Sequence, residues 1–174
     1  MDENMQLTDL ISLEDWVAFE REIHNRFGLD SNVFNTDGIR ITSHKAWVNK
    51  LCPAIKATDK GQSFICAVAH MNLATVASNT KKAVVEECDA GIAKIVVPIF
   101  VGETFLGAVG ACGKCLPDGE VESFLVNKIT EIDDDTIEAL AKDVDTISSE
   151  TVDELIRFVE QRIGEIVANY SDKV

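Results

Sequence analysis

Hydrophobic and polar positions recur with a helical period at both ends of the chain. Near the N-terminus, Ser12 supplies an N-cap hydroxyl, and apolar residues then follow at helical spacing until Gly28. Residues 149–170 carry one broad apolar face opposite charged positions, formed by Val152, Leu155, Ile156, Val159, Ile163, Ile166 and Val167. The pattern predicts an N-terminal helix and a long C-terminal helix, preceded by helical segments at 122–129 and 133–143.

In the middle of the chain the pattern changes to short runs rich in β-branched residues. Residues 32–35 and 39–42 flank an Asp37-Gly38 turn signal, which predicts a β-hairpin. Residues 83–85, 92–100 and 104–112 have the apolar density of strands, and Gly102-Glu103 suits a hairpin turn between the last two. The stretches 44–51 and 62–77, separated by the breakers Pro53 and Gly61, have helical spacing and predict short helices.

This order of elements predicts an α+β domain, in which helices flank an antiparallel sheet of five strands. A chain of 174 residues with 46% hydrophobic residues can bury a core of its own without disulfides or metal. No internal repeat or long linker divides it, so we expect one domain over residues 1–174.

The net charge of the chain and the length of its apolar runs restrict the partners that it can bind. A formal net charge of −14 repels nucleic-acid phosphates and anionic lipid surfaces. The first twenty residues mix acidic and apolar positions and predict no signal peptide. The longest apolar run, 95–101, contains Pro98 and is far shorter than the roughly 20 residues that cross a bilayer. We therefore expect a cytoplasmic protein that binds neither nucleic acid nor membranes.

The five cysteines are the main chemical feature of the sequence. An odd number without an export signal favours reduced thiols, at Cys52, Cys66, Cys88, Cys112 and Cys115. Cys112 and Cys115 form a C-x-x-C pair, which can close one corner of a tetrahedral metal site or form a redox disulfide. All-sulfur ligation suits zinc or an iron–sulfur cluster, with five candidates for four places. The simpler alternative is that each cysteine is a small buried hydrophobe.

Other side chains suggest a ligand pocket rather than catalysis. Five residues of the mid-chain helical stretches are candidates to line such a pocket: His44, Trp47, Phe64, His70 and Met71. The sequence contains no metalloprotease, nucleophile-elbow or phosphate-binding motif. We therefore expect a binding protein and not an enzyme, with an unidentified small organic ligand if the cysteines hold no metal.

Several segments together resemble the PocR sensory domain, over nearly the whole chain. They are residues 7–12, 35–38, 97–107, 132–135 and 147–150, with Cys52, Cys66 and the motif Cys88-Asp89-Ala90-Gly91-Ile92. The resemblance implies a PAS-like fold that senses a small molecule for a regulator. It implies an N-terminal helix in 1–28, a PAS-like core in 29–117 and a helical cap in 118–174. Asp89 and the Cys112–Cys115 segment depart from the family pattern and leave the ligand open.

The resulting hypothesis is a signal-sensing domain that binds a small molecule or a cysteine-ligated metal or iron–sulfur cofactor and signals by rearranging its helices. The expected metal ligands are the three cysteines that match the family plus Cys112 or Cys115. The alternative is a thiol-based redox or metal-handling protein that uses the Cys112/Cys115 pair. The expected partners are a second copy, through the C-terminal helix, and a signalling output protein.

Overall fold

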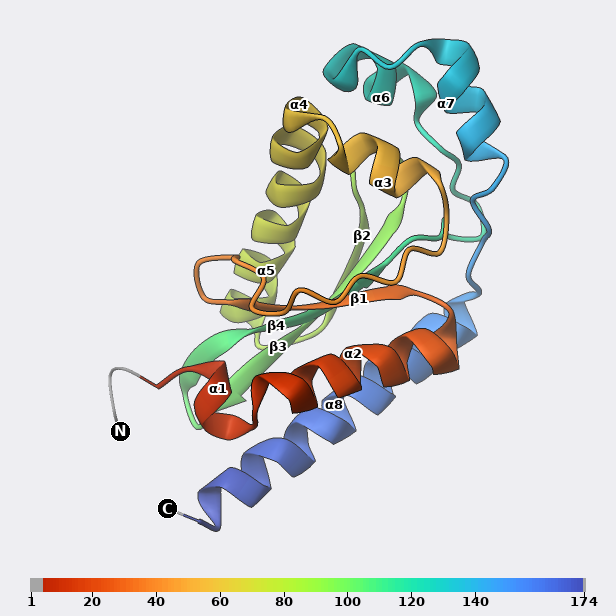
Figure 1. Ribbon diagram of the computed structural model, residues 1–174. Helices are drawn as coiled ribbons and strands as arrows, with labels where there is room; N and C mark the ends of the chain where they lie inside the picture. Colours follow the sequence, from red (N-terminus) through yellow and green to blue (C-terminus); the bar gives the residue numbers. More distant parts are fainter. Residues whose placement is uncertain (1–4, 174) are drawn as a thin grey trace.

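A computed structural model, which describes residues 5–173, gives an α+β fold with a four-stranded antiparallel sheet between two layers of helices (Figure 1). The strands are β1 (Asp30–Asn35), β2 (Val84–Glu87), β3 (Ala93–Val101) and β4 (Thr104–Cys112), in the order β1-β4-β3-β2. The helices are α1 (Leu7–Leu10), α2 (Leu13–Phe27), α3 (Leu51–Lys56), α4 (Asp59–Gly61), the π-helix η1 (Gln62–Ala67), α5 (Val68–Thr80), α6 (Ser123–Thr130), α7 (Asp134–Ala141) and α8 (Ser149–Ser171). Residues 1–4 and 174 of the predicted domain lie outside the described residues.

One face of the sheet carries the main hydrophobic core, under α1, α2 and α8. The helix α2 begins where the Ser12 hydroxyl accepts the Asp15 N–H and ends at Gly28 in the left-handed conformation, as predicted. Its Trp16 packs with Leu155 of α8 and Ile99 of β3 in a single buried cluster. The apolar face of α8 is therefore buried against its own sheet.

The opposite face of the sheet is covered by α3, α4, η1 and α5. Val96 and Ala108 pack there on Leu73 and Ala77 of α5. At one end of this layer, α6 and α7 lie beside α3 and α4 (Figure 1), and Val126 of α6 shares a second core with Leu51 and Ile55 of α3. Among residues 5–173 the structure holds no helix with the length and apolar character that crossing a bilayer requires.

The prediction of a fifth strand at 39–42 is wrong. This segment forms a single bridge between Arg40 and Phe34 of β1, with the Asn35 N–H donating to the Ile39 carbonyl at 2.9 Å. The ladder ends there because Arg40 turns toward the buried carboxylate of Glu20, to which its guanidinium lies at 3.2 Å. The predicted hairpin is thus reduced to its turn and one bridge, whereas the predicted hairpin of β3 and β4 is confirmed.

The middle helices also differ from their prediction. Residues 44–50 are not helical, and α3 begins only at Leu51, with Pro53 accommodated in its first turn, where proline needs no hydrogen-bonded N–H. Gly61 does not interrupt the helical stretch, which continues through η1 to Thr80. The predicted helices at 122–129 and 133–143 are present as α6 and α7.

Candidate cofactor and ligand site

Four of the five cysteines line one narrow cavity, of about 40 Å³, between the sheet and the helices α3 and η1. Each comes from a different element: Cys52 from α3, Cys66 from η1, Cys88 from the turn after β2, and Cys112 from the end of β4. All of them are free thiols. We call this space the four-cysteine cavity.

The sheet places a charged residue on each side of Cys112. Asp30 of β1, Cys112 of β4 and Lys94 of β3 lie directly opposite one another in the strand register. Residues paired in this way point to the same face of a sheet, and all three line the four-cysteine cavity. Lys94 is only 7% exposed, so its charged end is held inside the fold.

Asn49 attaches Cys52 to the segment that follows Cys112. Its side-chain oxygen accepts the Cys52 N–H at 2.7 Å, which caps the start of α3. Its amide nitrogen donates to the Gly113 carbonyl at 2.7 Å and lies 3.3 Å from the Cys52 sulfur. This buried side chain therefore fixes the spacing between two of the four thiols.

We expect Asn49→Ala to lower the free energy of unfolding by about 2 kcal/mol, because it removes a helix cap and leaves a buried carbonyl without its donor. The measurement is urea denaturation followed by circular dichroism. The matched control is Asn25→Ala, since Asn25 is exposed on α2 and its replacement should change stability by less than about 0.5 kcal/mol. Equal effects of the two substitutions would refute the role of Asn49.

A tight turn and a π-helix place the other two thiols. After β2, the Cys88 N–H donates to the Ile92 carbonyl at 2.9 Å and the Gly91 N–H donates to the Cys88 carbonyl at 2.8 Å. Gly91 has φ of 75°, and a side chain there would overlap the Glu120 carbonyl. Cys66 lies in η1, and π-helical turns occur often at functional sites.

Burial raises the pKa of three of the four thiols, while nearby lysines oppose this effect at Cys66 and Cys112. Burial raises the pKa of the Cys66 thiol to about 11, although Lys56 and Lys94 favour its thiolate. Burial also raises the pKa values of Cys52 and Cys112. Burial therefore favours the neutral form of Cys52, Cys66 and Cys112 when the cavity holds no metal.

Cys115 lies apart from the four-cysteine cavity. It is 4% exposed and packs in the second core with Val126 and Ile137. Its N–H donates to the Asp145 carbonyl and its carbonyl accepts the Ile147 N–H, both at 2.9 Å. The two thiols of the C-x-x-C pair thus have different surroundings.

The four thiols line the cavity without forming a ready metal site. Within residues 5–173, no three or more His, Cys, Asp or Glu side chains are arranged to hold a single metal ion.

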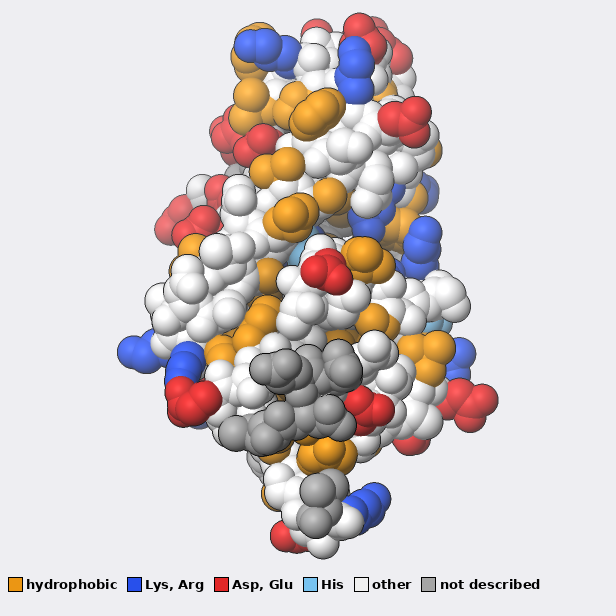
Figure 2. Space-filling view, turned by 90° about the vertical axis from the view of Figure 1, so that its left-hand side faces the viewer, with side chains coloured by type: hydrophobic (Ala, Val, Ile, Leu, Met, Phe, Trp, Pro, Cys, Tyr) orange, Lys and Arg blue, Asp and Glu red, His pale blue; other side chains and the backbone are white. Residues whose placement is uncertain are grey.

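The predicted pocket residues are dispersed. Trp47 lines the four-cysteine cavity, and His70 lines a wider cavity of about 450 Å³ beside it. The His44 carbonyl accepts a hydrogen bond from Arg40, but His44 is not among the residues that line either cavity. Phe64 is 59% exposed in η1. Figure 2, which views the molecule from its α5 side, shows apolar side chains scattered over the surface.

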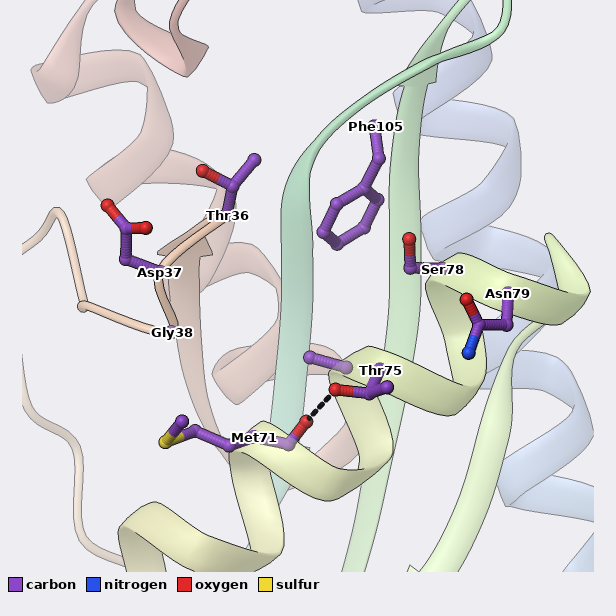
Figure 3. A pocket seen from close by; sticks show the side chains of 9 residues that line it. Thr36, Asp37, Gly38, Met71, Thr75, Ser78, Asn79 and Phe105 are labelled. Carbon is purple, nitrogen blue, oxygen red and sulfur yellow. Dashed lines mark hydrogen bonds between the residues drawn. The ribbon is translucent and has the colours of Figure 1, made fainter.

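Met71 contributes to a third, more open space of about 400 Å³, between the 36–38 turn and α5 (Figure 3). Phe105 of β4 lies toward its interior, and the Thr75 hydroxyl donates to the Met71 carbonyl at 2.9 Å. Asp37 is the charged residue that lines this space. The lining therefore provides few charged groups that could bind an anion or a metal ion.

Sequence reasoning missed Lys56, Lys94, Asp30 and Asn32, which complete the polar lining of the four-cysteine cavity. Lys94 could have been found, because a charged residue inside the apolar run 92–101 is unusual for a buried strand. Asn32 carries a buried side-chain oxygen with no hydrogen-bond partner among the described residues. This oxygen lies close to the backbone of Gly110, where any side chain would collide with it.

Comparison with known proteins agrees with the resemblance found in the sequence. Residues 9–170 match the family described as the sensory domain found in PocR. No curated protein and no solved structure matched the chain. Because the match covers nearly the whole chain, this protein belongs to the PocR sensory domain family.

Proposed function

We propose that this sensory domain responds through an iron–sulfur cluster ligated by Cys52, Cys66, Cys88 and Cys112. The observation that carries the proposal is that four thiols from four separate elements line one narrow cavity. Clusters of the two-iron and four-iron types are both held by four cysteine thiolates. Such a cluster would join the helical layer to the sheet.

The charges in the cavity support this occupant. A cluster with four thiolate ligands carries net negative charge, and Lys56 and Lys94 line the same cavity. Ligation releases the thiol protons, so the neutral thiols become anions beside the two ammonium groups. The negative charge of the ligated cluster would then balance the positive charge of the buried Lys94.

The shape of the cavity favours a cluster over the other two candidates from the sequence. A single zinc ion needs ligands that converge on one point, and no group of three or more potential ligands within residues 5–173 is arranged in this way. A drug-sized organic ligand usually occupies a cavity of about 300–1,000 Å³, whereas a cluster bonded directly to the four sulfur atoms can enter this narrow space as the thiols move apart.

A direct backbone route connects the cavity to the terminal helix. Three residues after Cys112, Cys115 forms a parallel bridge with Thr146, and Ile147 donates to the Cys115 carbonyl. Ser148 then caps the N-terminus of α8. Movement of Cys112 on cluster assembly or loss would shift this bridge and bias the position of α8, which is how a binding event becomes a signal.

The test is purification without oxygen, followed by reconstitution with ferrous iron and sulfide or with zinc. The proposal predicts a brown protein with a broad sulfur-to-iron absorption band and equal amounts of iron and acid-labile sulfide. A colourless protein that binds one zinc ion, or no metal, would contradict it.

A further inference from the structure

We propose that the wider cavity beside the four-cysteine cavity binds a small organic anion through its carboxylate group. This inference goes beyond the proposed cluster, because it assigns a second ligand to a separate space. The wider cavity has about 450 Å³ and is bounded by Phe34 and Ile39 on the β1 side, by Cys66 and His70 on the helical side, and by Lys94. Lys56, Cys66 and Lys94 line both cavities.

The wall of the wider cavity concentrates positive charge in a strongly acidic protein. Arg40, Lys45, Lys56 and Lys94 line it, and no acidic residue of the described part of the chain does. Within residues 5–173 none of these three lysines forms a salt bridge, and Lys94 is nearly buried. Because the side chains that face this cavity carry positive charge without a carboxylate among them, the wall favours an anion.

Aromatic contacts hold two of these cations at the cavity. The ammonium groups of Lys45 and Lys56 lie 5.9 and 5.4 Å from the centre of the Trp47 ring. The guanidinium of Arg40 is paired with Glu20, but its Nη1 is buried with no hydrogen-bond partner among the described residues. The cavity therefore offers donors that the protein itself does not use.

His70 is the most specific feature of this cavity. It is 2% exposed, and neither ring nitrogen has a hydrogen-bond partner among the described residues. Its ring stacks on Phe34, with the ring centres 3.2 Å apart. Burial, with a contribution from Lys94 and Lys56, lowers the pKa of His70 to about 2, so its imidazole is neutral and carries one N–H donor that a ligand can use.

The remaining lining determines the class of anion. Phe34, Ile39 and Ala67 add apolar surface to a lining that also contains the lysines. A short aliphatic or aromatic carboxylate matches both parts of this lining, whereas inorganic phosphate has no apolar part to place against Phe34. The volume is also in the range that small-molecule sites occupy.

The experiment is calorimetric titration of the purified chain with butyrate, benzoate and, as a comparison, inorganic phosphate. We expect the carboxylates to bind and Lys94→Met to weaken them about tenfold or more, because a charge-assisted hydrogen bond is lost. Lys82→Met is the matched control, since Lys82 is exposed in the turn after α5 and lines neither cavity. It should change the affinity by less than about twofold.

His70 gives a second test that does not depend on charge. His70→Leu should weaken the carboxylates, and His70→Gln, which keeps a donor, should retain more of the affinity. If Lys94→Met does not fold by circular dichroism, Lys56→Met takes its place.

Carboxylate binding can be tested separately from cluster binding. Cys52 lines the four-cysteine cavity but not the wider one, so Cys52→Ser should lose iron and still bind the carboxylates. The inference is overturned if no carboxylate binds, if Lys82→Met weakens binding as much as Lys94→Met, or if phosphate alone binds. None of these outcomes bears on the iron content, which tests the proposed function by itself.

Discussion

Alanine at any one of Cys52, Cys66, Cys88 or Cys112 is expected to remove most of the iron and sulfide from the protein purified without oxygen. Each substitution deletes one of four thiolate ligands that come from four different elements, and no neighbouring cysteine can replace it without moving a strand or a helix. Iron and acid-labile sulfide per chain are the quantities to measure.

Cys115→Ala is the matched control for these four substitutions. Cys115 is also a buried free thiol, but it packs against Val126 and Ile137 instead of lining the cavity. We expect it to keep the wild-type iron content. The assignment of ligands would be wrong if Cys115→Ala lost the cofactor or if Cys66→Ala retained it.

Gly91→Ala is expected to lower the free energy of unfolding by about 3 kcal/mol and to reduce the iron content as well. The residue has φ of 75°, which an L-residue adopts only with strain, and the new methyl group would overlap the Glu120 carbonyl. Relief of this overlap must displace the turn that carries Cys88, whose carbonyl accepts the Gly91 N–H. Urea denaturation measures the first effect and iron analysis the second.

Gly164→Ala controls for the change of residue type. Gly164 is exposed within α8 and nothing lies within 4 Å of the position of a new side chain. Alanine favours a helix over glycine, so this variant should gain about 1 kcal/mol and keep its iron. A Gly91→Ala protein as stable as wild type would contradict the packing described for the Cys88 turn.

The elements that local signals determine were predicted well from the sequence. Ser12 and Gly28 delimit α2, and Ser148 begins α8, because helix caps act through neighbouring residues. The hairpin of β3 and β4 follows from two apolar runs around Gly102-Glu103. In each of these cases the deciding residues are close together in the chain.

The errors occurred where distant residues decide the structure. The strand predicted at 39–42 is lost to the contact between Arg40 and Glu20, which are 20 positions apart. The helix predicted at 44–51 starts late because Asn49 caps α3 while it also donates to Gly113. Neither partner can be identified from periodicity.

The sequence singled out the cysteines, but it did not predict how the fold arranges them. The sequence indicated cysteine ligation, yet only the fold separates Cys115 from the other four cysteines. The register of β1, β4 and β3 is what places Lys94 beside Cys112. The register between strands cannot be derived from a single sequence.

Native mass spectrometry of the chain purified without oxygen tests the central claim most directly, because it weighs the intact protein with its cofactor. The four-cysteine cavity predicts a species heavier than the chain by equal numbers of iron and sulfide, which disappears in Cys66→Ala and persists in Cys115→Ala. A wild-type mass equal to that of the bare chain after reconstitution, or to that of the chain plus one zinc ion, would contradict the claim.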